Sequence, residues 1–334
     1  MKIGSTGNII LVHKGALGDF MLCWPCFYSI RRAFPEDRIH WCGNREFLGW
    51  LEPMNISPLP RSMESLVSSL YHRQHWPEAL SGHRIIWFGI RKKTVSCRDS
   101  RLVFINGVTG QGQAGFTETC MSRLEEKLCL PPLSWEYAWQ GYFGKRKKPE
   151  HVLIFVGSGS LKKNWPLDRF IRLAELLNSM GLKIKFILGP VEREKKLIVS
   201  GFDKVYCDSY DLLQDLIRRS LLVAGNDCGP MHLAAMYNIP GVVLFGPTSP
   251  AIWKPRGMEV IQSSRTCCPC TEDGIISCPQ PECLSDIQVE QVMSLIQEKI
   301  NNPEYEHPLK MEQKNRLPCL GKPGSRLLQK EEET

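Results

Sequence analysis

Residues 221–250 read LLVAGNDCGPMHLAAMYNIPGVVLFGPTSP, and their pattern determines the fold class. The apolar run at 221–227 is typical of a buried strand that ends in turn residues. Residues 231–238 then predict a helix that stops before Pro240, and residues 241–246 predict a second buried strand. A strand, a helix and a strand in this order form one unit of a parallel sheet.

The same alternation runs along the rest of the chain. Further buried strands are expected at 8–13, 38–43, 84–89, 151–157 and 183–189. Helices are expected between Phe20 and Phe34, over 116–129, from Pro166 to Gly181 and over 211–220, whereas 53–77 is rich in loop-forming residues. The sequence therefore predicts an α/β protein with parallel sheets that carry helices on both faces.

The length of 334 residues exceeds what one ordinary core uses and suits two domains. A basic segment containing Gly and Pro, GKRKKPE (144–150), interrupts the alternation. We expect an N-terminal Rossmann-like domain over 1–146, a C-terminal one over 150–300, and a polar tail over 301–334.

Composition narrows the class of protein. The chain has no apolar run of transmembrane length, and its start, MKIGSTGN, lacks a secretory apolar core, so we expect a cytoplasmic protein. The net charge of +7 fits an anionic ligand or a membrane surface but requires neither, and we expect no nucleic-acid partner. The basic segment GIRKKTVSCRDSR (89–101) fits a solvated loop, with contact to acceptor phosphate or membrane lipid as the alternative.

Four loops follow predicted strands, where open α/β sheets bind ligands: 14–19, 157–165, 189–194 and 225–232. In the first, KGALGD, Asp19 stands at a helix start. Its carboxylate would accept hydrogen bonds from helix N–H groups as a cap, or face a cleft as a general base. The spacing alone favours the cap.

The second and fourth loops combine small residues with polar groups. GSGSLKKNWP (157–166) offers hydroxyls, two lysines and a helix start with free N–H groups, which suit a phosphate; a solvated loop anchored by Trp165 is the plain alternative. In NDCGPMH (226–232), Gly229 and Pro230 fit a tight helix start. Asp227 and His232 would then face a ligand, or serve as a cap and a satisfied core histidine.

Taken together and in this order, GALGD, GSGSLKKNWP and NDCGPMHLA…LFGPTSP resemble glycosyltransferase family 9, the lipopolysaccharide heptosyltransferase family. The resemblance spans residues from about 9 to about 300, and its last motif is the most specific. It implies the GT-B fold, in which two Rossmann-like domains face each other across a cleft. It also implies inverting transfer of a sugar, heptose in characterised members, from ADP-heptose to a lipid-linked saccharide at the inner membrane face.

The resemblance assigns roles to residues of this chain. Asp19 matches the catalytic base, which deprotonates the acceptor hydroxyl, and Lys163 matches the lysine that contacts donor phosphate. The donor-binding positions are Ser158, Gly159, Glu192, Asp227, Gly229 and His232, with Glu194 as a competitor for the ribose-binding role of Glu192. Asn226 and Cys228 differ from common family neighbours, so the motifs do not identify the nucleobase or the donor sugar.

The family pattern needs no metal cofactor. The chain has no Asp-x-Asp triad, the metal–diphosphate motif of the other large glycosyltransferase fold, so protein groups would neutralise the leaving diphosphate. Mg²⁺ could still assist loosely.

Fourteen cysteines are unusual for a chain of this kind, and five of them fall in CCPCTEDGIISCPQPECL. Cys267, Cys270, Cys278 and Cys283 could form a structural zinc or iron–sulfur site. The wider final spacing favours reduced or partly disulfide-linked structural cysteines.

Two further functions remain as alternatives to the inverting transferase. One is a GT-B-like nucleotide-sugar epimerase or hydrolase, which would turn over the donor without an acceptor. The other is a catalytically inactive module that binds nucleotide or lipid, although the joint presence of Asp19, Lys163, Asp227 and His232 disfavours it. The motifs identify neither the acceptor nor the oligomeric state.

Overall fold

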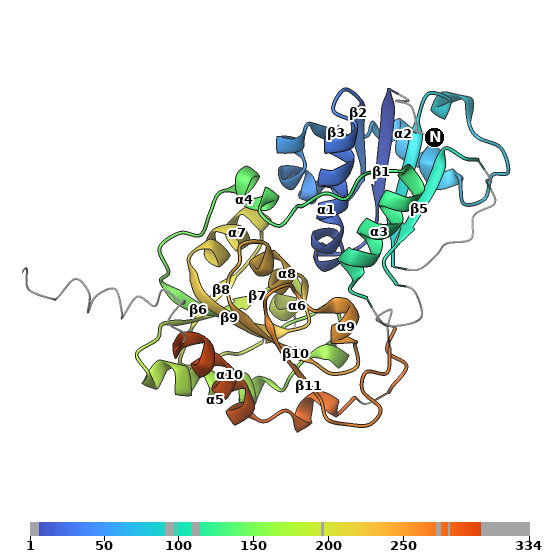
Figure 1. Cartoon of the computed structure of the whole chain (residues 1–334). Helices are drawn as coiled ribbons and strands as arrows, with labels where there is room; N and C mark the ends of the chain where they lie inside the picture. The colour runs from blue at the N-terminus through green and yellow to red at the C-terminus, as the bar shows by residue number, and fades with distance from the viewer. Residues whose placement is uncertain are drawn as a thin grey trace, which may run out of the picture.

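The computed structural model describes residues 7–90, 97, 99–108, 114–194, 197–271, 275–279 and 281–301. They form two α/β lobes, each built on one parallel sheet (Figure 1). The sheet of the N-terminal lobe has the order β3-β2-β1-β4-β5. Its strands are β1 (Asn8–His13), β2 (Arg38–Gly43), β3 (Ile56–Pro58), β4 (Arg84–Gly89) and β5 (Leu102–Asn106).

The sheet of the C-terminal lobe has the order β11-β10-β9-β6-β7-β8, and every pairing is parallel. Its strands are β6 (His151–Phe155), β7 (Ile184–Leu188), β8 (Asp203–Tyr206), β9 (Ser220–Asn226), β10 (Gly241–Phe245) and β11 (Glu259–Gln262). The order reverses beside β6, so β6 and β9 lie at the switch point where ligands bind in such sheets.

Helices cover both faces of each sheet. In the N-terminal lobe, side chains of β1 alternate: Ile9 and Leu11 pack toward the other lobe, whereas Ile10 and Val12 pack away from it. The helices of this lobe are α1 (Leu17–Ala33), α2 (Arg61–Ser69), α3 (Phe116–Leu128), α4 (Ala138–Phe143) and the 3₁₀ turns η1 (Arg45–Trp50), η2 (Glu52–Met54) and η3 (Glu78–Leu80).

The C-terminal lobe has α7 and α8 on the face that meets the other lobe and α5 and α10 on the far face. Its helices are α5 (Leu167–Ser179), α6 (Pro190–Glu194), α7 (Tyr210–Arg218), α8 (Gly229–Met236), α9 (Pro250–Trp253), α10 (Val289–Asn301) and the 3₁₀ turns η4 (Leu161–Lys163) and η5 (Cys283–Asp286). None of the described helices is long and apolar enough to cross a bilayer.

One apolar core continues across the two lobes. Helix α1 packs against α8, and an aromatic layer joins the lobes beside this contact. Tyr210 of α7 lies 5.5 Å from Phe47 and 5.2 Å from Trp50 between ring centroids, and the Trp50 indole donates a hydrogen bond of 2.5 Å to Gln214. These contacts fix the two lobes against each other in the form seen here.

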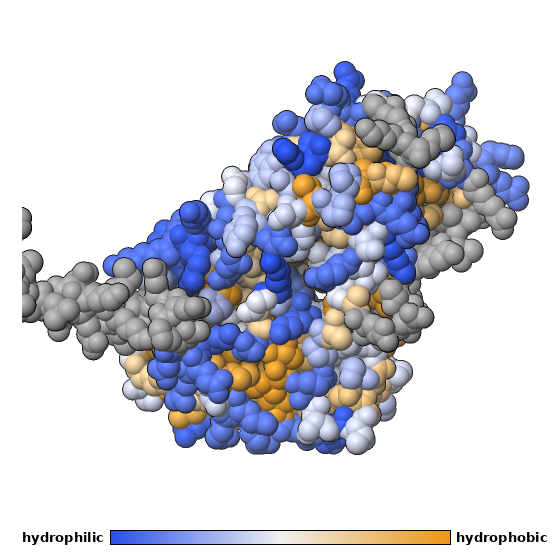
Figure 2. Space-filling model, viewed as in Figure 1, coloured by the Kyte–Doolittle hydropathy of each residue, from blue (hydrophilic) through white to orange (hydrophobic). Residues whose placement is uncertain are grey.

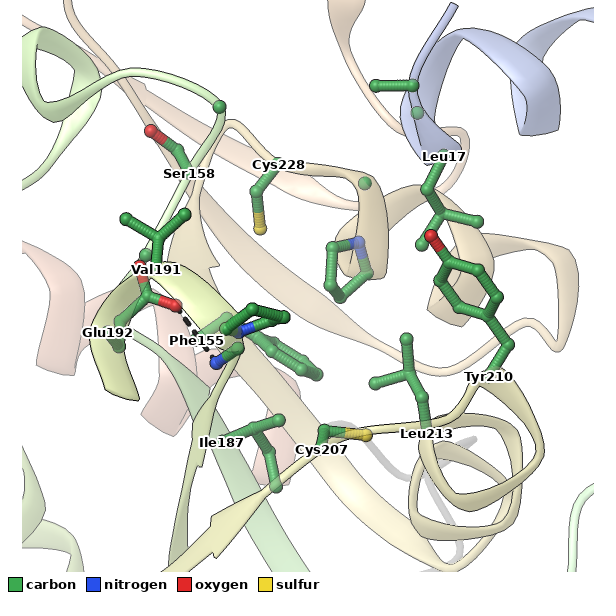
Figure 3. A pocket seen from close by; sticks show the side chains of 18 of the residues that line it. Leu17, Phe155, Ser158, Ile187, Val191, Glu192, Cys207, Tyr210, Leu213 and Cys228 are labelled. Carbon is green, nitrogen blue, oxygen red and sulfur yellow. Dashed lines mark hydrogen bonds between the residues drawn. The ribbon is translucent and has the colours of Figure 1, made fainter. Parts of the chain in front are cut away.

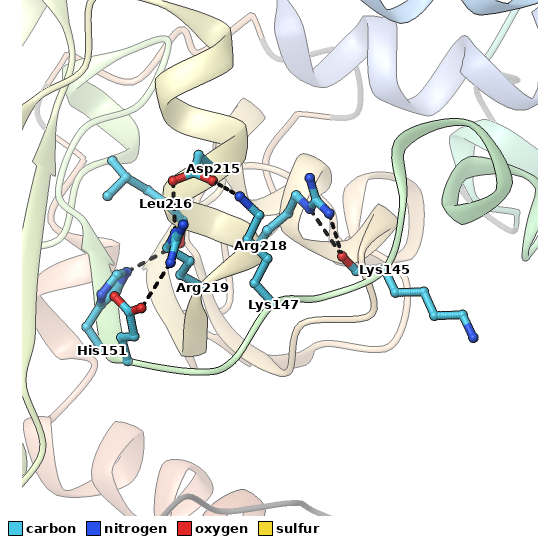
Figure 4. Close-up of polar contacts among 8 residues, drawn as sticks. Lys145, Lys147, His151, Asp215, Leu216, Arg218 and Arg219 are labelled. Atoms are coloured by element: carbon cyan, nitrogen blue, oxygen red, sulfur yellow. Dashed lines mark hydrogen bonds and ion pairs between the residues drawn. The ribbon is translucent and has the colours of Figure 1, made fainter.

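The segment predicted as the break between domains runs along the C-terminal lobe (Figure 4). The Arg218 guanidinium donates to the Lys145 carbonyl at 3.1 and 3.0 Å, and Lys147 pairs with Asp215. Of the basic side chains of this segment, Lys147 is thus bound to α7 and Arg146 to carbonyls at the start of β9, whereas those of Lys145 and Lys148 are exposed. The boundary at 146–150 stays a prediction.

Several elements were not anticipated. The region 53–77, which is rich in loop-forming residues and to which we assigned no element, contains β3 and α2. The strands β5, β8 and β11 and the helices α4, α6, α9 and α10 were also missed. β8 has no fully buried residue and α2 has only Val67 buried, so neither shows the apolar run or stripe that sequence patterns detect. The alternation of strands and helices with parallel sheets, predicted from the sequence, is confirmed.

Candidate functional site

A cavity of about 400 Å³ lies between the lobes at the carboxyl ends of the strands of the C-terminal sheet (Figure 3). The N-terminal lobe contributes Ala16, Leu17, Gly18 and Glu46 to its wall. The C-terminal lobe contributes the loops after β6, β7, β8 and β9, including Ser158, Glu192, Tyr210 and Cys228. Its floor is apolar, with Phe155, Ile187, Cys207 and Leu213. This combination suits a ligand with a flat apolar part and several polar groups.

Asp19 lies in the first turn of α1, at the edge of the contact between the lobes. It was predicted to be the N-cap, but that position is held by Ala16, and Asp19 is the third residue of the helix. Its Oδ2 accepts a hydrogen bond of 3.1 Å from the Ala16 N–H, which still satisfies a free N–H group at the helix start and leaves Oδ1 for another partner. A Cβ at Gly15 would lie 2.6 Å from Oδ2, so only glycine lets the carboxylate fold back over the loop.

The pKa of Asp19 is raised above its usual value, mainly because burial disfavours the charged form. The Ala16 hydrogen bond and the nearby Lys163 lower that pKa, and Asp227 raises it. Lys163 and Asp227 belong to the other lobe, so Asp19 lies within electrostatic reach of the C-terminal site. The raised pKa makes the Asp19 carboxylate a stronger base than an exposed one.

Lys163 and Asp227 form an ion pair on the C-terminal side of the gap. The Lys163 ammonium lies 2.9 Å from Asp227 Oδ2, and the Thr248 hydroxyl donates to the same oxygen at 2.8 Å. The side chains of Lys163 and Asp227 are only 19% and 8% exposed, so the pair lies in a partly dry environment that strengthens its interaction with an incoming anion. Thr248 lies in GPTSP, a segment that the sequence flagged without singling out this residue.

The other residues of the second loop are arranged around backbone groups. Ser158 Oγ lies 2.7 Å from the Ser160 carbonyl and 2.6 Å from Asn164 Oδ1, so its single proton is donated within the loop. Gly159 lines the cavity, and a Cβ there would meet open space. The loop therefore presents backbone and small side chains to the cavity, as a phosphate-binding loop does.

Of the two competing glutamates, Glu192 is the one that lines the cavity. Its Oε2 accepts a hydrogen bond of 2.9 Å from the Gly189 N–H, which Figure 3 shows as a dashed line. A Cβ at Gly157 would lie 2.1 Å from Glu192 Oε1, so glycine is needed there to admit the carboxylate. The carboxylate is held where it can accept hydrogen bonds from hydroxyl groups.

Helix α8 begins at Gly229, which lines the cavity together with Pro230 and Cys228. A Cβ at Gly229 would lie 2.9 Å from Leu17 Cβ, so this glycine allows the lobes to touch. The helix start thus points its free N–H groups toward the cavity, where they favour an anion.

His232 lies behind that helix start rather than in the cavity wall. It lines a smaller cavity of about 30 Å³ together with Met21 and Leu22 of α1. Burial lowers its pKa to about 4, while Asp227 raises it and Lys163 lowers it. His232 is therefore neutral at physiological pH and within electrostatic reach of both members of the ion pair.

Two residues that the sequence did not select belong to the site. Tyr210 follows β8, with its hydroxyl end near Leu17 in Figure 3, and burial raises its pKa. Glu46 reaches the cavity from η1 of the N-terminal lobe. Recognising β8 as a strand would have marked the loop before Tyr210; no local pattern marks Glu46.

The cysteine cluster lies next to the loop at residues 157–166. The Lys162 ammonium donates to the carbonyls of Ile276 at 3.2 Å and Cys278 at 2.7 Å, which ties the cluster to the second loop. Burial, with the Cys283 and Cys267 thiols nearby, raises the pKa of Cys268 to about 12. Across the ranges that the structure describes, no three His, Cys, Asp or Glu side chains are arranged to hold a metal ion.

Much of the basic segment at 89–101 falls outside the described residues, as does the tail beyond 301. Of its charged residues, the described Arg101 pairs with Asp99 at 2.7 Å. The view in Figure 2 shows a largely hydrophilic surface, with an apolar patch over β10 and β11 beside α10.

Known proteins resemble this chain in sequence over part of its length. Residues 136–279 match the model for glycosyltransferase family 9 (heptosyltransferase). Lipopolysaccharide heptosyltransferase 3 of Escherichia coli (strain K12) is 26% identical over 228 residues, which cover 64% of this chain and 60% of that protein. The match thus leaves two fifths of that relative uncovered.

Solved structures share the fold. The glycosyl transferase family 9 protein of Veillonella parvula superposes with a TM-score of 0.61 at 18% identity, covering 89% of this chain and 98% of that one. E. coli heptosyltransferase WaaC with ADP gives a TM-score of 0.61 at 16% identity, covering 87% and 99% of the two chains. These structures confirm the expected GT-B fold, and the match over residues 136–279 supports the resemblance to glycosyltransferase family 9 seen in the sequence.

Proposed function

We propose that the protein is an inverting glycosyltransferase that moves a sugar from a nucleotide-sugar to a lipid-linked saccharide. Heptose is the proposed sugar, ADP-heptose the proposed donor and the lipopolysaccharide core the proposed acceptor. One observation carries the proposal: the Lys163–Asp227 ion pair of one lobe lies close enough to Asp19 of the other to affect the pKa of its carboxyl, beside a cavity of about 400 Å³. An acceptor and an activated donor could meet in that gap.

In the proposed reaction, Asp19 Oδ1 takes the proton of the acceptor hydroxyl as that oxygen bonds to the anomeric carbon. The bond from the anomeric carbon to the diphosphate oxygen breaks on the opposite side, which inverts the configuration. The nucleoside diphosphate leaves with the electron pair, and negative charge grows on its phosphate oxygens. Lys163 and the N–H groups that begin α8 stabilise that charge.

The remaining contacts hold the donor. Glu192, anchored by the Gly189 N–H, accepts hydrogen bonds from ribose hydroxyls. In this proposal the nucleobase of the donor lies on the apolar floor of the cavity, near Cys207 and Leu213. His232, which burial keeps neutral, acts from behind the helix start, where it can donate one ring N–H toward Asp227 or the diphosphate. In this scheme protein groups neutralise the charge of the leaving diphosphate, and Mg²⁺ is not required but could bind weakly and assist.

The proposal is tested by incubating the protein with ADP-heptose in the presence and absence of a lipopolysaccharide-core acceptor. Transfer to the acceptor with inversion at the anomeric carbon is the expected result. Donor turnover without acceptor would instead identify an epimerase or hydrolase. Binding of ADP without any turnover would identify an inactive nucleotide-binding module.

A thermal-shift panel of ADP, UDP and GDP tests the donor class separately. A ligand that binds only the folded state raises the melting temperature by mass action. ADP is expected to give the largest shift in melting temperature. A larger shift with UDP or GDP would indicate that the donor carries uracil or guanine instead of adenine.

Location and cofactors complete the proposal. We place the protein in the cytoplasm, in peripheral contact with the inner face of the membrane where a lipid-linked acceptor lies. Co-sedimentation with anionic vesicles that weakens with salt is expected, whereas salt-independent binding would contradict electrostatic attachment. The cysteine cluster is proposed to hold reduced structural thiols, and metal analysis of protein purified without air distinguishes these from zinc or an iron–sulfur site.

A further inference from the structure

Asn226 is the last residue of β9 and directly precedes Asp227. The sequence singled it out as a residue that differs from common family neighbours. Its side chain is fully buried and does not line the cavity. Any effect that Asn226 has on the site must therefore pass through other residues.

Both polar groups of the Asn226 side chain bind the backbone of the phosphate-side loop. Nδ2 donates to the Val156 carbonyl at 2.7 Å, and Oδ1 accepts from the Trp165 N–H at 2.8 Å. Val156 and Trp165 stand at the two ends of the loop 157–164. One carboxamide thus bridges the two ends of that loop, which requires a donor and an acceptor on the same short side chain.

The ends that Asn226 joins are themselves rigid. Val156 directly follows β6 in the centre of the sheet. Trp165 is 2% exposed, packs edge-on against Phe170 at 4.8 Å, and donates its indole N–H to the Ile287 carbonyl at 3.0 Å. The carboxamide therefore fixes the loop relative to β9 rather than merely following its motion.

The loop carries the groups that would meet the diphosphate. Gly159 lines the cavity, and Lys163 extends from η4 to Asp227 at 2.9 Å. Two consecutive residues at the end of β9 thus hold the same loop: Asn226, the last residue of the strand, binds the backbone at both loop ends, and Asp227, which follows it, pairs with the Lys163 ammonium. A shift of the loop by a fraction of an ångström would move Lys163 and the loop N–H groups away from the phosphates together.

We propose that Asn226 is a positioning residue for the diphosphate of the donor, acting by closing the loop 157–164 with its carboxamide. This inference rests on the proposed function, since it assumes that a nucleoside diphosphate occupies the cavity. It predicts that the side chain controls affinity for the diphosphate and leaves affinity for the nucleoside almost unchanged.

Asn226→Asp tests the inference with a nearly isosteric change. The introduced carboxyl can still accept from Trp165, but it can donate to Val156 only while protonated. As pH rises and the carboxyl ionises, its oxygen faces the Val156 carbonyl oxygen and the loop end is released. Affinity for ADP in the variant is therefore expected to equal that of the wild type at low pH and to fall about tenfold at high pH.

The measurement is calorimetric titration with ADP and with adenosine between pH 5 and pH 8, given as the ratio of variant to wild-type Kd. The ratio removes the pH dependence that both proteins share, including that of Asp19 and His232. Asn178→Asp makes the same change on the exposed face of α5 and is expected to give a flat ratio near one. Adenosine binding by the variant reports that the fold is intact.

Asn226→Ala lacks both groups and is expected to bind ADP weakly at every pH while retaining adenosine. A pH-independent ratio near one for Asn226→Asp would overturn the inference, and so would equal losses of ADP and adenosine. If the wild type binds no ADP, both the proposed function and this inference are wrong. If the wild type binds ADP and both variants bind it with the same Kd, only the inference is wrong.

Discussion

Asp19→Asn separates the two roles that Asp19 can have. The amide keeps an oxygen that accepts the hydrogen bond from the Ala16 N–H, now 3.1 Å from Oδ2, so the helix cap survives. It cannot take a proton from an acceptor hydroxyl. Removal of a general base lowers rates by about 100- to 10,000-fold, so kcat for sugar transfer is expected to fall within that range.

The same substitution should leave stability unchanged or improve it. Burial raises the pKa of the Asp19 carboxyl, so the folded state binds this proton more tightly than the unfolded state. Folding stability therefore decreases as pH rises through the raised pKa, and at neutral pH the buried charge is a cost. The amide has no such cost, so Asp19→Asn should melt at the same temperature as the wild type or higher.

Asp19→Ala provides the contrast, because it removes the cap and the base together. Both variants remove the buried charge, but only Asp19→Ala loses the hydrogen bond to the Ala16 N–H. Loss of such a helix-start contact costs about 1 kcal/mol of unfolding free energy, so Asp19→Ala should melt about 3 °C below Asp19→Asn. Its kcat should match that of Asp19→Asn. The two variants thus share the loss of rate and differ in stability.

Initial rates of ADP release with saturating donor and acceptor give kcat, and thermal unfolding gives stability. Glu290→Gln makes the same acid-to-amide change in the first turn of α10, at an exposed position, and should alter neither. An Asp19→Asn protein with kcat within about threefold of the wild type would refute the role of Asp19 as general base, because loss of a general base lowers kcat much further. The carboxylate would then be a helix cap alone.

Three other results are expected. Lys163→Met should weaken ADP binding by about tenfold or more, whereas Lys162→Met, whose ammonium binds carbonyls of the cysteine loop, should not; equal losses would contradict the assignment. The kcat of the wild type should rise with pH through a pKa above the usual aspartate value, because Asp19 must be ionised; a profile flat between pH 4 and pH 8, or one rising only through an ordinary aspartate pKa, would count against it. Gly229→Ala places a Cβ 2.9 Å from Leu17 and should lower kcat by separating the lobes, while Gly141→Ala, which meets open space, should not.

In both lobes the sequence predicted the buried central strands and missed short or exposed elements, for a physical reason. Strands such as β6 and β9 are buried on both faces, so they appear as continuous apolar runs that no polar residue interrupts. Edge strands such as β8 expose their side chains and lose that signal. Parallel topology then placed the loops correctly, because every strand of a parallel sheet ends at the same edge.

Side-chain partners were beyond the reach of sequence patterns. Asn226 and Asp227 are adjacent in sequence, yet the Asn226 side chain binds the backbone of Trp165 and the Asp227 side chain binds Lys163. The geometry of the sheet determines the direction of each side chain. Thr248 reaches Asp227 from a strand end 21 residues away. Motif spacing locates such residues near the site, but the direction of each side chain depends on tertiary packing.

The surroundings of Asp19 explain how a carboxylate at a helix start can remain basic. A helix N-terminus and a neighbouring cation both favour the ionised form and would normally weaken it as a base. Two histidines flank it, His13 beneath the loop and His232 beside Gly18, and burial lowers the pKa of each to about 4. Both are neutral at physiological pH, so neither adds a positive charge beside the carboxylate. Lys163 is the nearby cation that lowers the pKa of Asp19, and its partner Asp227 opposes that effect. When a diphosphate engages Lys163, its negative charge raises the pKa of Asp19 further, so donor binding is expected to strengthen the base just before the acceptor is deprotonated.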